Sequence, residues 1–121
     1  MIVVDTSVWI DHFGRPEPDL KALVASGDVC LHPYVFGELL LGGLPANGTI
    51  AEQLQLLPAP PVAKVGEAAT FIGWAGLTGT GVGYVDAHLL VSARLLGNGS
   101  VLTRDKRLRI QAKRLGLAYQ L

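Results

Sequence analysis

Four acidic residues occupy positions at which alternating strands and helices would gather carboxylates. Asp5 follows the short apolar run Ile2–Val4, and Asp105 follows a similar run, Ser100–Thr103. Apolar runs of this kind are typical of buried strands, and open parallel sheets place their ligands at the carboxyl ends of the strands. Taken alone, Asp5 is explained equally well as a helix N-cap, because Asp, Thr and Ser are all preferred there.

Glu38 and Asp86 fall in predicted helices. Glu38 lies in a helix that starts near Pro33, just after another predicted strand, and Asp86 lies in the first turn of a largely apolar helix that starts at Tyr84. Both helices would begin at the sheet edge that carries Asp5 and Asp105. Carboxylates at close range cannot all ionise, and a divalent cation removes the conflict. Oxygen ligands alone suit Mg²⁺ or Mn²⁺ rather than zinc.

The elements that must position these acids alternate along the chain. Strands are predicted over 2–4, 29–31 and 100–103, with a last edge strand over 117–121. Helices are predicted from 6, 19, 33 and 49 onward, the last through capping-box spacing of Thr49 and Glu52, and over 64–77, 84–96 and 106–115. Strands alternating with helices indicate an α/β fold. We expect a single domain over 1–121, built as a three-layer sandwich with a short-stranded, mostly parallel central sheet flanked by helices.

Composition limits the classes of partner and cofactor. Half of the 121 residues are hydrophobic, which suffices for one core, and ten basic residues balance ten acidic ones. Cys30 is the only cysteine, so neither an internal disulfide nor a cysteine-based zinc cluster is possible. Its apolar neighbours predict a buried thiol. Without a leader pattern or a long apolar run, the sequence predicts a soluble cytoplasmic protein that does not enter a membrane.

The segments around the four acids resemble those of PIN domains, specifically the VapC-type toxin ribonucleases. The matching segments are Ile-Val-Val-Asp5-Thr-Ser, Tyr-Val-Phe-Gly-Glu38-Leu, Gly-Tyr-Val-Asp86-Ala-His-Leu-Leu-Val-Ser-Ala-Arg and Leu-Thr-Arg-Asp105. Each motif alone is weak, but four in this order across the whole chain are fairly specific. The resemblance implies that the four acids are the catalytic, metal-binding carboxylates of a Mg²⁺-dependent endoribonuclease, with Mn²⁺ as a substitute.

The resemblance has further implications. The hydroxyls of Thr6, Ser7 and Thr103 would orient the acids, and hydrolysis would leave a 5′-phosphate and a 3′-hydroxyl. The substrate would be RNA of the tRNA or rRNA class. The partners would be a second copy of the chain and a cognate VapB-type antitoxin of a type II toxin–antitoxin pair. Many relatives carry another acid where this chain has Arg107, so the number of metal ions, one or two, stays open.

Other residues admit more than one interpretation. Six of the ten basic residues lie between 104 and 114, where Arg104 and Lys106 would contact RNA phosphates or belong to a solvated helix face. His12 and His32 are expected to be exposed or near loops. His88 lies two residues after Asp86, so the two side chains should not face the same way on a helix.

Two rival functions share part of this pattern. A receiver-like phospho-accepting signalling domain also has an acidic Mg²⁺ pocket at its strand ends, but it needs paired acids after the first strand, and Asp5 is followed by Thr6 and Ser7. A PIN scaffold that binds RNA or protein without cutting is the other rival. Four intact acids argue against it without excluding it.

Overall fold

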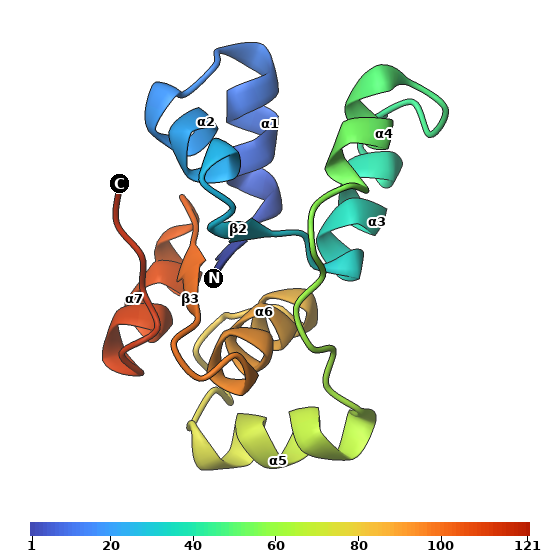
Figure 1. The fold of residues 1–121 in the computed structure, drawn as a ribbon. Helices are drawn as coiled ribbons and strands as arrows, with labels where there is room; N and C mark the ends of the chain where they lie inside the picture. The colour runs from blue at the N-terminus through green and yellow to red at the C-terminus, as the bar shows by residue number, and fades with distance from the viewer.

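Three short parallel strands form the centre of the molecule. The computed structural model describes all 121 residues and contains β1 (Ile2–Val4), β2 (Val29–Cys30) and β3 (Ser100–Leu102), arranged in the order β2-β1-β3. Ile2 lies opposite both Val29 and Ser100, and Val4 lies opposite Leu102 (Figure 1). Because the strands are parallel, their carboxyl ends share one edge of the sheet.

Helices surround this sheet and complete the α/β sandwich expected from the sequence. Figure 1 shows α6 on one side of the strands with α5 outside it, and α1 and α2 on the opposite side. The helices are α1 (Thr6–Gly14), α2 (Pro18–Ala25), α3 (Pro33–Leu41), α4 (Thr49–Leu54), α5 (Val65–Trp74), α6 (Tyr84–Leu95) and α7 (Lys106–Arg114). None of them is both long and apolar enough to span a membrane.

Helix α6 is the central helix, as its apolar sequence predicts. It packs against β1 and β3 on one side and against α5 on the other. Every residue from Ala87 to Ala93 is consequently buried. A helix that is covered on both sides must be apolar over most of its circumference. Even Ser92 is buried, and its hydroxyl donates to the carbonyl of Pro61 at 2.6 Å.

Some predicted boundaries are wrong because contacts distant in sequence decide them. Strand β2 ends at Cys30, since the next amide, that of Leu31, donates to the carbonyl of Pro58 in the loop before α5. The edge strand expected over 117–121 is only a single parallel bridge between Val101 and Ala118. Helix α2 begins at Pro18 with Glu17 as its N-cap, and the first turn, not the cap, holds Asp19.

The capping box expected at Thr49 does not form. Gly48 is the N-cap of α4, and no side chain caps this helix. The equivalent interaction occurs at α5 instead, where the Glu67 carboxylate accepts from the backbone N–H of Lys64 at 2.9 Å. Cys30 is buried as predicted, and burial raises the pKa of its thiol to about 11.

We predict that Gly99→Ala destabilises the protein by about 1–3 kcal/mol, the usual range for overpacking. A Cβ atom at this position, just before β3, would overlap the carbonyl oxygen of Ala93 and lie 2.8 Å from Cβ of Leu96. Gly73→Ala in α5 is the matched control, because nothing lies within 4 Å of the position that its Cβ would take. Urea unfolding of both variants checks this; equal midpoints would contradict the packing argument.

Candidate active site

Two of the four acids follow adjacent strands of the sheet, because β1 and β3 are parallel neighbours. Asp5 follows β1 and Asp105 follows Arg104 just beyond β3. The backbone N–H of Asp5 donates to the carbonyl of Leu102 at 2.9 Å, which extends the pairing of the two strands to the start of α1. Each acid is also the N-cap of the helix that follows it, α1 and α7 respectively.

Asp5 is both a helix cap and a buried carboxylate, so the two interpretations of this residue do not compete. Its side chain is enclosed, with 5% of the residue exposed. Oδ1 accepts from the backbone N–H of Thr6 at 2.7 Å, and Oδ2 accepts from the hydroxyls of Ser7 at 3.0 Å and Thr103 at 2.7 Å. Three donors offset much of the desolvation that burial imposes on a carboxylate.

The hydroxyl groups near Asp5 also connect it to two other acids. Thr6 Oγ1 donates to Glu38 Oε1 on α3 at 2.7 Å. Thr103 Oγ1 accepts from the backbone N–H of Asp105 at 3.0 Å while donating to Asp5. The carboxylate of Asp105 accepts from the N–H of Leu108, 2.9 Å away, and remains exposed. Thr6, Ser7 and Thr103 therefore all contact the acidic residues or their backbone.

The pKa of Asp86 reflects its burial and the negative charge of the other three acids. Helix α6 leads into β3 through the short turn 96–99, so its first turn lies at the carboxyl edge of the sheet. Burial, followed by the negative charges of Asp5, Asp105 and Glu38, raises the pKa of the Asp86 carboxyl to about 7. None of the four acids forms an ion pair with a basic side chain. The structure thus brings all four within electrostatic reach without a compensating cation.

Comparison with known proteins agrees with this arrangement. Residues 2–114 match the family model described as the PIN domain. The chain belongs to the PIN domain family. It is 38% identical over 118 residues to Ribonuclease VapC32 of Mycobacterium tuberculosis, strain CDC 1551 / Oshkosh, covering 98% of this chain and 95% of that protein. The protein of the same name from strain ATCC 25618 / H37Rv matches equally well.

Solved PIN-type structures share the fold. FitAcB from Neisseria gonorrhoeae superposes with a TM-score of 0.61 and 25% identity, over 93% of this chain and 94% of that one. A structure of FitAB bound to an IR36 DNA fragment gives a TM-score of 0.62 at 25% identity, over 93% and 91% of the two chains. The family resemblance and the three-layer α/β architecture predicted from the sequence are therefore confirmed.

The four acids have the right chemistry for a hard cation, but they do not converge on one point. All four are oxygen donors, and their mutual repulsion is expressed in the raised pKa of Asp86. No three Asp, Glu, His or Cys side chains lie close enough to hold one metal ion between them. Mg²⁺ usually keeps several waters and binds directly to only one or two carboxylates, so the donor set fits this ion better than a cation that needs a closed protein cage.

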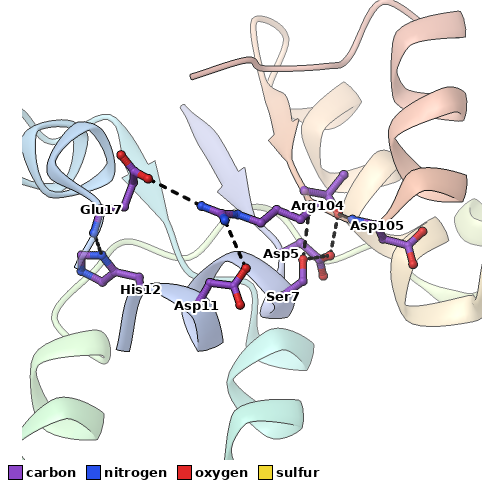
Figure 2. A network of polar contacts seen from close by, with 8 residues as sticks. Asp5, Ser7, Asp11, His12, Glu17, Arg104 and Asp105 are labelled. Atoms are coloured by element: carbon purple, nitrogen blue, oxygen red, sulfur yellow. Dashed lines mark hydrogen bonds and ion pairs between the residues drawn. The ribbon is translucent and has the colours of Figure 1, made fainter. Parts of the chain in front are cut away.

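Arg104 lies away from the acids. Its guanidinium pairs with Asp11 at 3.2 Å and with Glu17 at 3.7 Å (Figure 2). Figure 2 shows the side chain extended across α1, away from the carboxylates of Asp5 and Asp105. Such partly exposed pairs are worth little energetically. Lys106 is exposed and forms no ion pair, so of the two basic side chains expected to contact RNA, only Lys106 is free in this conformation.

Arg107, the residue that left the number of metal ions open in the sequence, packs against a glycine loop. Its Cδ atom lies 2.9 Å from where a Cβ of Gly81 would be. Gly81 has a positive φ of 84° and precedes α6. A side chain at Gly81 would be strained by this backbone conformation and would also collide with Arg107. Arg107 therefore connects α7 to the loop before Asp86 and adds no further carboxylate to the four acids.

His32 is more buried than the sequence predicts. His32 was expected to be exposed or near a loop; it does precede α3, but it is fully buried as the N-cap, accepting from the N–H of Tyr34 at 3.0 Å. His88 is also buried, and neither of its ring nitrogens has a partner within the protein. Burial, with the neighbouring His88, lowers the pKa of His32 to about 4, and burial lowers the pKa of His88.

We predict that Thr103→Val destabilises the fold by about 1–3 kcal/mol, the cost of leaving a buried polar group unsatisfied. The substitution keeps the shape but removes the donor to Asp5 Oδ2 and the acceptor for the N–H of Asp105. Thr103→Ser keeps the hydroxyl and should retain most of the stability. Chemical denaturation of the three proteins checks this, and a Val variant as stable as the Ser variant would contradict it.

A second prediction concerns pH in metal-free protein. The Asp86 carboxyl keeps its proton up to a pKa of about 7 when folded, against 3.8 without the shift. Between these values the unfolded chain loses this proton and the folded one retains it, so the contribution of Asp86 to stability falls as the pH rises. His32, with a pKa of about 4 in place of 6.5, acts in the opposite sense. The test is therefore the difference between wild type and Asp86→Asn.

We expect the melting temperature of the wild type, relative to Asp86→Asn, to fall between pH about 4 and about 7 in EDTA, and to level off above. Thermal melts followed by circular dichroism measure this difference directly. A difference that stays constant over the range would show that Asp86 titrates normally.

Proposed function

We propose that this chain is a Mg²⁺-dependent endoribonuclease toxin that hydrolyses RNA phosphodiester bonds at Asp5, Glu38, Asp86 and Asp105. The observation that carries the proposal is the uncompensated negative charge at one edge of the sheet. Asp86 has a pKa of about 7 because of burial and the three other acids, and no basic side chain pairs with any of them. Similarity to Ribonuclease VapC32 across nearly the whole chain supports the activity.

The four carboxylates would surround the ion, one or two of them binding it directly and the others through its bound waters, with Mn²⁺ as a substitute. When bound, Mg²⁺ supplies electrostatic stabilisation of the phosphate oxygens and makes a coordinated water more acidic. The proton on Asp86 must leave before its carboxylate can serve as a ligand, so ion binding releases a proton near neutral pH. Arg107 stands where the resemblance implies a further acid, and this argues against a full second metal site.

The remaining groups of the site keep the carboxylates in place. The Ser7 and Thr103 hydroxyls hold Oδ2 of Asp5, and the Thr6 hydroxyl holds Glu38. Each hydroxyl limits the rotation of a carboxylate, as the outer partners of metal ligands do in general. Water attack in line with the leaving oxygen would give a 5′-phosphate and a 3′-hydroxyl.

The partners we propose follow from the same relatives. RNA of the tRNA or rRNA class is the substrate, and a VapB-type antitoxin covers the site in a type II toxin–antitoxin pair, as the VapC name and the FitAB complex suggest. We also propose that the chain forms a homodimer and acts in the cytoplasm. Exposed apolar side chains such as Leu41, Leu56 and Val65, which are 90%, 82% and 78% exposed, are available for such contacts.

Cleavage of a structured RNA by the purified chain tests the activity. We expect cuts with Mg²⁺ or Mn²⁺, none with EDTA, and a loss of more than about a hundredfold in Asp5→Asn, since even an outer partner of a metal ligand is worth roughly 10- to 100-fold. Asp19→Asn is the matched control, because Asp19 is an exposed acid on α2 outside the four site motifs.

Three outcomes would count against the proposal. Equal cutting by Asp5→Asn and wild type would remove Asp5 from the site. Cutting that persists in EDTA would exclude the metal. Binding of RNA without any cut, together with normal growth of cells that express the chain, would favour the scaffold that binds without cleaving.

A further inference from the structure

An aromatic cluster joins the first turns of α3 and α6. Tyr34 and Tyr84 both pack edge-on against the imidazole of His88, with ring centroids 4.9 and 4.6 Å from it. His32 lies behind Tyr34 at 4.7 Å. The two tyrosines thus flank one buried imidazole, although they are fifty positions apart in sequence.

The two tyrosines are exposed, whereas the histidines behind them are not. Tyr84 is 55% and Tyr34 is 38% exposed, compared with 1% for His88 and 0% for His32. Neither tyrosine hydroxyl has a hydrogen-bond partner in the protein. Among aromatic side chains, only Trp74 on α5 is similarly exposed, at 62%, and the Arg94 guanidinium covers its ring at 4.4 Å. The uncovered aromatic surface is therefore concentrated at this cluster.

The cluster lies at the same edge of the sheet as the four acids. Tyr34 precedes Glu38 by four residues, so both side chains lie along one face of α3. Tyr84 is in the same first turn of α6 as Asp86. Both helices begin at the carboxyl edge of the sheet, where Asp5 and Asp105 cap α1 and α7. Because Tyr84 and Asp86 are two residues apart, their side chains face different sides of α6, so Tyr34 with Glu38 provides the link between the cluster and the acids.

Electrostatics alone would not bring a nucleic acid to this edge. The chain has no net charge, the four acids repel phosphates, and Arg104 is paired with Asp11 and Glu17, which leaves Lys106 as the one free cation of the two expected to contact RNA. A second source of binding free energy is therefore needed beside this single charge. Aromatic rings provide one, because any unpaired base can stack on them, while bases within a duplex are not available.

We infer that Tyr34 and Tyr84 form a stacking platform that holds an unpaired base of an RNA strand next to the phosphodiester positioned at the four acids. This inference rests on the proposed ribonuclease function and names two further residues that position its substrate. His88 and His32 act behind the platform: His88 separates the rings and supports them. The platform selects single-stranded RNA and is tolerant of sequence.

A short single-stranded RNA carrying 2-aminopurine tests the platform, because stacking quenches the fluorescence of this base. The full chain is titrated in EDTA and again in Mg²⁺. We expect wild type to quench the probe, and Tyr34→Leu and Tyr84→Leu to bind roughly 5- to 100-fold more weakly, the range for loss of one stacked base. Leucine keeps apolar cover over His88 while removing the aromatic face.

Phenylalanine variants and a distant control separate stacking from packing. Tyr34→Phe and Tyr84→Phe should restore quenching, and Trp74→Leu should bind like wild type. If cleavage occurs, the loss in the Leu variants should fall mainly on KM. Duplex RNA of the same sequence should not quench.

The outcomes distinguish this inference from the activity itself. Quenching that depends on the tyrosines, without any cutting, would retain the platform and reject the nuclease. Cutting by wild type with an unchanged KM in both Leu variants would reject the platform and retain the nuclease. Absence of probe binding by wild type in both buffers, or failure of the Phe variants to rescue binding, would also overturn the inference.

Discussion

The structure depends on the burial of one carboxylate. Asp5 lies between a strand and a helix with 5% of its surface exposed, and a buried carboxyl group is tolerated only when hydrogen-bond partners surround it. Thr6 and Ser7, the two residues after Asp5, supply two of these donors, and Thr103 supplies the third from 98 positions away. The parallel pairing of β1 with β3, the start of α1 and the hydrogen-bond network of the site all meet at this group.

A second constraint, the repulsion among the acids, destabilises the same edge of the sheet. The same edge carries three more acids, and the chain leaves them without a cation: Arg104 extends toward Asp11 and Glu17, and Arg107 lies on the loop at Gly81. A protein selected only for stability would neutralise such a cluster. Departures from local optimality of this kind are expected at functional sites, where stability is given up for reactivity.

The sequence predicts the site better than it predicts its surroundings. Asp5 and Asp105 could be placed because short apolar runs define strands, and parallel strands end at a common edge. Asp86 could be placed because its helix is apolar all round and hence central. The metal-binding role of the four acids stays a prediction, since it depends on an ion and not on the fold alone.

The features that the sequence could not predict depend on contacts remote along the chain. His32 is buried beside His88 of α6, with ring centroids 6.4 Å apart, and the end of β2 follows from the carbonyl of Pro58. The orientation of Arg104 is decided by acids on α1 and before α2. Local patterns carry no signal for such pairings, because each residue type involved also occurs on solvated surfaces.

The hydrogen bond from Thr103 to Asp5 also limits when the site can form during synthesis of the chain. A chain emerging from the ribosome exposes Asp5 first and Thr103 only 98 positions later, and β1 lacks its β3 partner until then. Contacts between such distant positions form late, after the intervening loop has been closed. A growing chain therefore carries the acids of Asp5, Glu38 and Asp86 without their final arrangement until β3 and Thr103 have been synthesised.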